Sequence, residues 1–136
     1  MIEILIAIGV AVIALLSISR ITSRSIINTG SASRQSTAIN YAQTAVDMVR
    51  NTKNALGLAG KTSPSLANGT WCFNGTAVDT ATSGYCQINL EYQGRVTFTH
   101  TTINLKDELT VLAEVQWVEG NLTRTVKNEA KMVFDQ

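Results

Sequence analysis

The first part of the chain is almost wholly apolar. Residues 4–19 form an uncharged run, with Glu3 just before it and Arg20 just after it. The run is slightly shorter than the roughly 20 residues that span a bilayer core. An apolar rod of this kind has two suitable surroundings, a membrane or a bundle of like rods. Beyond the run the chain is an ordinary polar sequence, rich in Thr, Asn, Ser and Ala.

A helical period of apolar residues follows. The apolar positions are Ile39, Ala42, Val46 and Val49, widened by Ala38, Tyr41, Ala45 and Met48. This spacing predicts an amphipathic helix over 36–54 that packs on a sheet. No proline interrupts 21–54, so we expect one helix from Ile2 to Asn54, roughly 80 Å long, whose first half projects from the domain. Lys53 and Gly57 indicate its end.

The second half of the chain alternates apolar and polar residues. Residues 55–85 are polar and rich in glycine, and we interpret them as a loop that Trp71 and Phe73 pin to the core. Residues 86–136 read as antiparallel strands, the first over 86–93. The Gly120-Asn121 turn predicts a hairpin with these pairs: Trp117 with Arg124, Val115 with Val126, and Leu109 with Met132.

These elements predict an α+β fold of one domain with an appendage. A long N-terminal helix has a projecting apolar half over 1–35, and its amphipathic half packs on an antiparallel sheet of about four strands. The globular head domain, 36–136, is then made of helix 36–54, loop 55–85 and sheet 86–136.

Cys72 and Cys86 are the two cysteines of the chain. If the apolar run anchors a domain outside the cytoplasm, the compartment is oxidising and the pair forms a disulfide. The alternative is a pair of buried free thiols or weak metal ligands. The net charge of +1 gives no sign of a generally nucleic-acid-binding protein.

Glu3 distinguishes the kinds of apolar segment. A signal peptide begins with positive charge, and here no Lys or Arg precedes Arg20. A simple membrane anchor does not usually begin with a carboxylate, because a charge near hydrocarbon costs about 2–3 kcal/mol on insertion scales. A carboxylate in an apolar bundle is tolerable when it is paired, and the N-terminal ammonium of an adjacent subunit is a suitable partner. In a monomeric anchor it would instead lie at the headgroup boundary.

The opening residues MIEILIAIGVAVIALL resemble the N-terminus of mature type IV pilins and type II secretion pseudopilins. The resemblance is sharp over 1–16 and extends as a pattern to residue 54. It implies that a peptidase removes a basic leader and methylates the new N-terminus, and that Glu3 neutralises the terminal amine of a neighbouring subunit. The filament-core helix would include Ile4, Leu5, Ile8, Val12, Leu15 and Leu16. Glu3 lies two residues earlier than in the family, and residues 17–22 lack the family's frequent proline.

The resemblance implies a structural, non-enzymatic filament subunit for attachment, twitching motility or DNA uptake. Its partners would be identical copies, the inner-membrane assembly machinery and the prepilin peptidase. The subunit would reside in the cytoplasmic membrane before assembly and in a cell-surface filament afterwards. The alternatives are a minor pilin, a pseudopilin or a DNA-capturing subunit. The sheet cations available for DNA are Lys106, Arg124, Lys127 and Lys131.

Other chemistry is sparse. His100 is the only histidine, and no catalytic, nucleotide-binding or cofactor motif accompanies it, so we expect no catalytic residue and no cofactor. Asp107-Glu108 offers too few oxygen ligands for Ca²⁺, and we expect no metal. Asn68 and Asn74 each begin an Asn-Gly-Thr acceptor pattern for glycosylation in the predicted loop, and Asn121-Leu-Thr also matches. The same residues are also ordinary turn formers.

Overall fold

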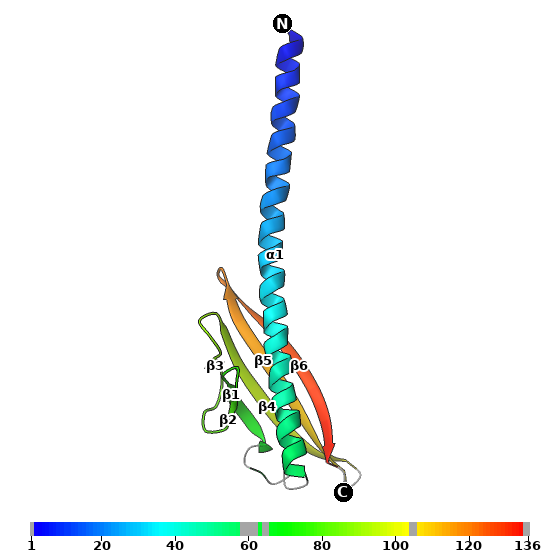
Figure 1. The fold of residues 1–136 in the computed structure, drawn as a ribbon, viewed down its shortest axis with the longest axis vertical. Helices are drawn as coiled ribbons and strands as arrows, with labels where there is room; N and C mark the ends of the chain where they lie inside the picture. Colours follow the sequence, from blue (N-terminus) through cyan, green and yellow to red (C-terminus); the bar gives the residue numbers. More distant parts are fainter. Residues whose placement is uncertain (1, 58–62, 64–65, 104–105, 135–136) are drawn as a thin grey trace. The chain divides into compact units, whose positions relative to one another are not determined.

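The computed structural model describes residues 2–57, 63, 66–103 and 106–134. The chain divides into two compact units, Met1–Arg34 and Gln35–Gln136, and we call the second unit the head. One helix and six strands occur in the described residues (Figure 1): α1 (Ile2–Leu56), β1 (Gly69–Phe73), β2 (Val78–Asp79), β3 (Cys86–Gln87), β4 (Tyr92–Ile103), β5 (Lys106–Glu119) and β6 (Leu122–Phe134).

Helix α1 includes the stretch 12–30, where serine, threonine and Gly30 lower the helix propensity. Several hydroxyls there donate to the carbonyl four residues earlier, so they do not compete with the helix for its amide groups. The helix ends at Leu56. Gly57 follows with φ 55°, the left-handed conformation that commonly caps a helix and that glycine adopts without strain.

The sheet is larger than the sequence predicts. Its six strands are antiparallel in the order β2-β1-β4-β5-β6, and β3 pairs with β4 beside β1. The predicted fold class, a long helix on a sheet of about four strands, is therefore wrong: the sheet, and not the helix, dominates the head. The extra strands come from residues 55–85, which we predicted to be a loop but which contain β1 and β2.

Strand β1 was not predicted because it is short and lies within residues 55–85, a stretch that is otherwise polar. Its residues Gly69–Phe73 pair with Gly94–Phe98 of β4, so the strand is fixed by a neighbour distant in sequence rather than by a local alternating pattern. Phe73 is fully buried, as expected of a residue that pins this region to the core. Trp71 is half-buried, and its Nε1 donates to the carbonyl of Ala67 at 3.1 Å.

The predicted strand over 86–93 is also wrong. The Oδ1 atom of Asn89 accepts the backbone N–H groups of Glu91 and Tyr92, at 2.9 and 3.0 Å. This side chain replaces the hydrogen bonds of a strand and bends the chain between β3 and β4. Leu90, which alternation placed on the core face, is consequently 96% exposed.

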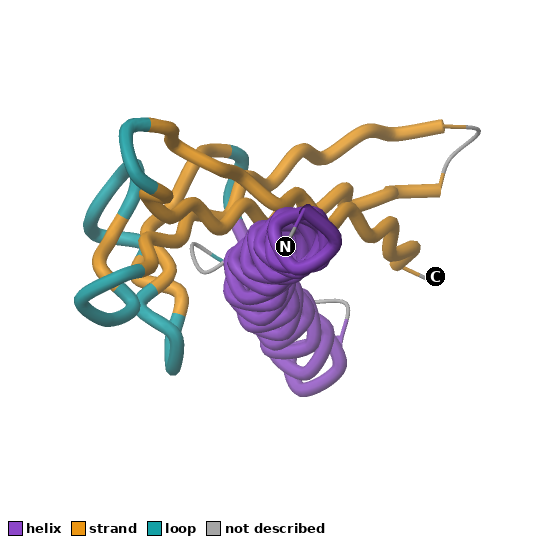
Figure 2. Tube along the Cα trace, turned by 90° about the horizontal axis from the view of Figure 1, so that it is seen from above, coloured by secondary structure: helices purple, strands orange, loops and turns teal. Residues whose placement is uncertain are grey.

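The core of the head lies between one face of the sheet and the part of α1 within the head (Figure 2). The buried helix positions are Ala38, Ala42, Ala45, Val46 and Val49. Ile39, predicted to lie in this stripe, is 37% exposed, and Ala38 takes the core position. The large buried strand residues include Phe98, Leu109, Val111 and Phe134.

The β5–β6 hairpin has the register that the turn predicts. Trp117 lies opposite Arg124, Val115 opposite Val126, and Leu109 opposite Met132. Gly120 has φ 63°, as a two-residue hairpin turn demands. Local turn chemistry and the alternating pattern agree here, which explains why the pairing was predictable.

The predicted disulfide between Cys72 and Cys86 is confirmed. It joins β1 to β3, and the two Cα atoms are 5.2 Å apart. Both strands already pair with β4 around Gly94. The covalent link therefore closes the loop that holds the shortest strands of the sheet.

We predict that replacing both cysteines by serine lowers the free energy of unfolding by about 3 kcal/mol, because the loop is no longer closed in the unfolded chain. Urea denaturation followed by tryptophan fluorescence measures the change. A reductant should destabilise the natural chain and leave the double variant unaffected. Equal midpoints for the reduced and the oxidised natural chain would contradict this role.

Candidate functional site

The apolar segment, which we define as residues 8–18 of α1, is the most unusual surface of the described chain. Seven of its large apolar side chains are 49–67% exposed: Ile8, Val10, Val12, Ile13, Leu15, Leu16 and Ile18. An α-helix turns by about 100° per residue, so these seven side chains point to every side of the helix. A helix that is apolar all round is normally buried. In water, the apolar segment is therefore unfavourable unless other apolar groups enclose it.

Two hydroxyls near the end of the apolar segment, those of Ser17 and Thr22, have hydrogen-bond partners within the helix. The hydroxyl of Ser17 donates to the carbonyl of Ile13 at 2.9 Å, and that of Thr22 donates to Ile18 at 3.0 Å. A buried hydroxyl without a partner costs about 1–3 kcal/mol. Because these hydroxyls already have a partner within the helix, close packing against another helix leaves neither of them unpaired.

The structure describes the side chains of four of the six residues that we predicted to form a filament core. Ile8, Val12, Leu15 and Leu16 are exposed apolar residues of the apolar segment. The side chains of Glu3, Ile4 and Leu5 lie outside the described ones. Our prediction omitted Val10, Ile13 and Ile18, although the unbroken apolar run was a signal for all of them. Within the described residues, α1 contains no stretch that is both long and apolar enough to cross a membrane.

A buried carboxylate lies on the sheet face opposite α1. Glu114 is 2% exposed, although alternation along β5 places it on the polar face. It forms an ion pair with Arg95 of β4 and another with Lys127 of β6, whose Nζ lies 2.8 Å from Oε1. Arg95 in turn lies over the ring of Tyr85, 4.4 Å from its centroid. Strands β4, β5 and β6 and the disulfide loop are thus connected through interactions around the carboxylate of Glu114.

These partners set the protonation of Glu114. Burial by itself raises the pKa of this carboxyl, but the hydrogen bonds and charges of Arg95 and Lys127 outweigh burial. The pKa of Glu114 therefore lies below its ordinary value. The carboxylate stays ionised at neutral pH and stabilises the head.

The predicted cations of the sheet are largely neutralised. Lys127 pairs with Glu114, the Nζ of Lys131 lies 3.1 Å from Glu108, and the Nε of Arg124 lies 3.4 Å from Glu119. They form pairs along the strands and not a continuous basic surface, so this geometry does not favour DNA capture.

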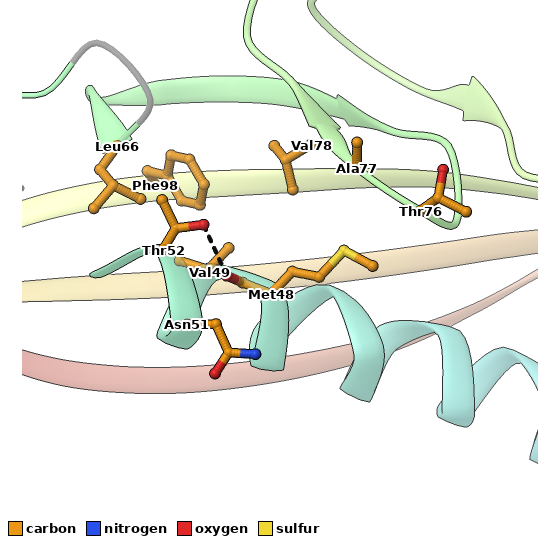
Figure 3. A pocket seen from close by; sticks show the side chains of 9 residues that line it. All are labelled: Met48, Val49, Asn51, Thr52, Leu66, Thr76, Ala77, Val78 and Phe98. Atoms are coloured by element: carbon orange, nitrogen blue, oxygen red, sulfur yellow. Dashed lines mark hydrogen bonds between the residues drawn. The ribbon is translucent and has the colours of Figure 1, made fainter. Parts of the chain in front are cut away.

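An open hollow of about 390 Å³ lies beside α1 (Figure 3). It is lined by Met48, Val49, Asn51, Thr52, Leu66, Thr76, Ala77, Val78 and Phe98, none of which titrates. The Thr52 hydroxyl donates a hydrogen bond to the carbonyl oxygen of Met48 at 2.9 Å. The hollow offers apolar contact and no group for acid, base or nucleophilic chemistry.

His100 has a packing role in the structure. Its Nε2 lies 2.7 Å from the carbonyl oxygen of Leu66, and its ring stacks on Phe134 with centroids 6.0 Å apart. Asp107 accepts a hydrogen bond from Thr102 at 2.6 Å. In the described ranges, no group of three or more His, Cys, Asp or Glu side chains could hold a metal ion.

The two predicted glycosylation residues differ in their surroundings. The Oδ1 of Asn68 accepts the backbone N–H of His100 at 2.6 Å. Asn74 lies in the turn between β1 and β2, and its Oδ1 accepts from Thr76 and Ala77. Both asparagines are exposed.

Comparison with known proteins identifies no relative: no family model matches the chain, and neither a curated protein nor a solved structure matches it.

We predict that Glu114→Gln lowers the stability of the head by about 2 kcal/mol at pH 7, because two charge-assisted hydrogen bonds are weakened. The folded-state pKa is depressed, so the contribution of Glu114 is present above the ordinary pKa and is lost as the pH falls through the folded value. The natural chain should therefore lose more stability than the variant between pH 7 and pH 3. Urea unfolding at both pH values measures this difference.

Glu129→Gln is the matched control, since Glu129 is exposed on the same sheet face. It should change stability by less than about 0.5 kcal/mol at pH 7. If Glu114→Gln and Glu129→Gln have the same stability and the same pH dependence, the buried network contributes nothing.

Proposed function

We propose that this chain is a non-enzymatic structural subunit of a type IV pilin-like filament, and that identical copies polymerise through the apolar segment. The observation that carries the proposal is the exposure of large apolar side chains on every side of residues 8–18. The resemblance of residues 1–16 to pilins points to the same assembly.

The distribution of these side chains favours several neighbours over one. A two-stranded coiled coil buries a single seam of apolar positions. Here a single partner would leave the far side of the helix, with Val10 or Val12, in water. Several helices around each copy remove all sides from solvent together. This is the arrangement of a filament core.

Removing the apolar segment from water supplies a free energy of the same order as the cost of association. Fully burying one Val, Leu or Ile side chain contributes about 1.5–3 kcal/mol. For seven half-exposed side chains, we expect on the order of 10 kcal/mol per subunit. Association costs an estimated 4–15 kcal/mol. Relative to water, burial of the apolar segment is thus comparable with the whole cost. A subunit that starts in lipid does not gain this energy, because lipid is as apolar as the bundle, so its assembly depends on close packing of the helices and on the pairing of Glu3.

Glu3 supplies the register in this proposal. Apolar contact is non-directional, so helices in a bundle could slide along one another. A carboxylate in such a bundle requires a partner, and the N-terminal ammonium of the next subunit provides one. Pairing at one height would fix the axial step of the filament. Removal of a leader peptide would create that ammonium group.

The head fits display outside the cytoplasm. Its Cys72–Cys86 disulfide is typical of oxidising compartments. We propose that the subunit waits in the cytoplasmic membrane and is assembled by membrane machinery into a surface filament, after a prepilin peptidase has processed it. Attachment to surfaces is the function that an exposed polymer of such heads would serve.

We predict that Leu15→Asp reduces filament yield at least about tenfold, because a charge in the bundle costs more than the 1.4 kcal/mol that a tenfold change requires. Counting sheared filaments by electron microscopy and immunoblotting measures the yield. The matched control is Leu90→Asp, an equal substitution at a 96% exposed leucine of the head, which should assemble normally. Normal yield from Leu15→Asp would overturn the filament proposal.

The Glu3→Ala variant separates two proposed roles: the axial register that the Glu3 charge pair sets, and the apolar contact between the helices. We expect this variant to accumulate in the membrane and to assemble poorly, because the apolar contacts remain and the charge pair is lost. Filaments in normal number from Glu3→Ala would refute the pairing role and leave polymerisation through the apolar segment intact.

A further inference from the structure

Three segments of the head match the acceptor pattern for N-linked glycans, and they begin at Asn68, Asn74 and Asn121. The pattern cannot rank them, whereas the structure can. We propose that Asn74 is the glycosylation site of this chain and that the other two are not modified.

Asn74 and Thr76 form a preorganised acceptor. The Oδ1 atom of Asn74 accepts the backbone N–H of Thr76 at 3.0 Å and its hydroxyl at 3.0 Å. The N–H of Ala77 donates to the same oxygen at 2.9 Å. Gly75 between them has φ 91°, a conformation that suits glycine. All polar contacts of the side chain in the described residues are on its oxygen, so its Nδ2 is left to react.

The chemistry needs this arrangement. An amide nitrogen is a poor nucleophile because its lone pair is delocalised onto the oxygen. Donors on Oδ1 stabilise negative charge on the amide and so acidify the Nδ2–H bonds. A transferase base can then take one proton while Nδ2 attacks the anomeric carbon of a polyprenyl-pyrophosphate-linked sugar. The new bond joins Nδ2 to that carbon, the carbon–oxygen bond to phosphate breaks, and polyprenyl pyrophosphate leaves.

Asn68 lacks this arrangement. Its Oδ1 accepts the backbone N–H of His100 at 2.6 Å, from a distant strand and not from Thr70 of its own acceptor pattern. The hydroxyl of Thr70 shares a hydrogen bond with Thr97 at 3.1 Å. Gly69 and Thr70 are already paired with β4, so the acceptor pattern is held extended within the sheet. Strand pairing would have to break before the threonine could reach the asparagine.

Asn121 is also unsuited. It occupies the two-residue turn after Gly120, and Thr123 two residues on lies in β6 opposite Val118. Among the described residues, no hydrogen bond joins the Thr123 hydroxyl to Asn121. The pattern is thus divided between a turn and a paired strand.

The turn around Asn74 also leaves room for a sugar. It connects β1 to β2, and β2 is the last strand on its side of the sheet. Asn74, Thr76 and Ala77 are exposed, and the open hollow begins at Thr76 and Ala77 (Figure 3).

The test uses the full chain purified from its natural cells. N-glycans are released enzymatically in heavy-oxygen water, which converts a glycosylated asparagine to labelled aspartate, and peptides are sequenced by mass spectrometry. A parallel sample without the enzyme corrects for spontaneous deamidation of the Asn-Gly pairs. We expect the label at Asn74 and its absence from Asn68 and Asn121. A chain that carries no N-glycan, or carries it at another asparagine, overturns the proposal.

Variants expressed in the same cells separate the acceptor from its turn. Asn74→Asp retains the oxygen that organises the turn and removes the nucleophilic nitrogen, so the glycan should be lost. Its thermal unfolding temperature should stay close to that of the natural sequence made without a glycan in cells that lack the transferase. Thr76→Ala should also lose the glycan, whereas Thr70→Ala should keep it. Retention of the glycan by Thr76→Ala, or its loss from Thr70→Ala, would contradict the assignment. The filament proposal is not involved, because monomers serve equally well.

Discussion

One constraint dominates this protein: no side of the apolar segment is shielded from water by the described residues of the single chain. Residues 8–18 expose large apolar side chains all round the helix, and water is an unfavourable environment for each of them. No rearrangement of a single straight helix can hide them, because their directions differ. Burial has to come from surroundings that enclose the helix. The proposed bundle of identical helices would meet this demand, and so would lipid.

The same helix shows the contrast between two ways of burial. In the head, its apolar residues follow one stripe, with Ala42, Val46 and Val49 buried against the sheet. That stripe is satisfied within the subunit. In the apolar segment there is no polar side that could face water. Helix α1 is thus amphipathic in the head, where one side packs on the sheet. In the apolar segment it is apolar on all sides, and nothing in the described part of the subunit buries it. The change is visible in the sequence between residues 19 and 38.

Most features that depend on residues close together in the sequence could be predicted, and features that depend on distant residues could not. The β5–β6 register was predictable because Gly120-Asn121 and the alternation of β5 both act locally. The bend at Asn89 was not, because alternation of Ile88, Leu90 and Tyr92 suits a strand equally well until the amide side chain takes over the backbone hydrogen bonds. Strand β1 was missed because its five residues have no strict alternation and lie within an otherwise polar stretch, so that its pairing with distant β4 defines it.

The polar network illustrates the same limit. Glu114 lies on the face of β5 opposite the core residues, yet it is buried and paired with Arg95 and Lys127. The register of three strands brings the charges together, and a sequence shows that register only after the sheet is known. For the candidate site, Ile8, Val12, Leu15 and Leu16 could be selected from composition, while the complete ring of side chains required the geometry of the helix.

Polymerisation through the apolar segment is tested most directly by electron cryo-microscopy of filaments sheared from the cells that make this chain. The map should trace this sequence as the repeating subunit, with the helices at the filament axis and residues 8–18 of each copy in contact with several neighbours. A map whose subunit is another chain, or one in which the apolar segment faces solvent or a single partner, would contradict assembly through this segment.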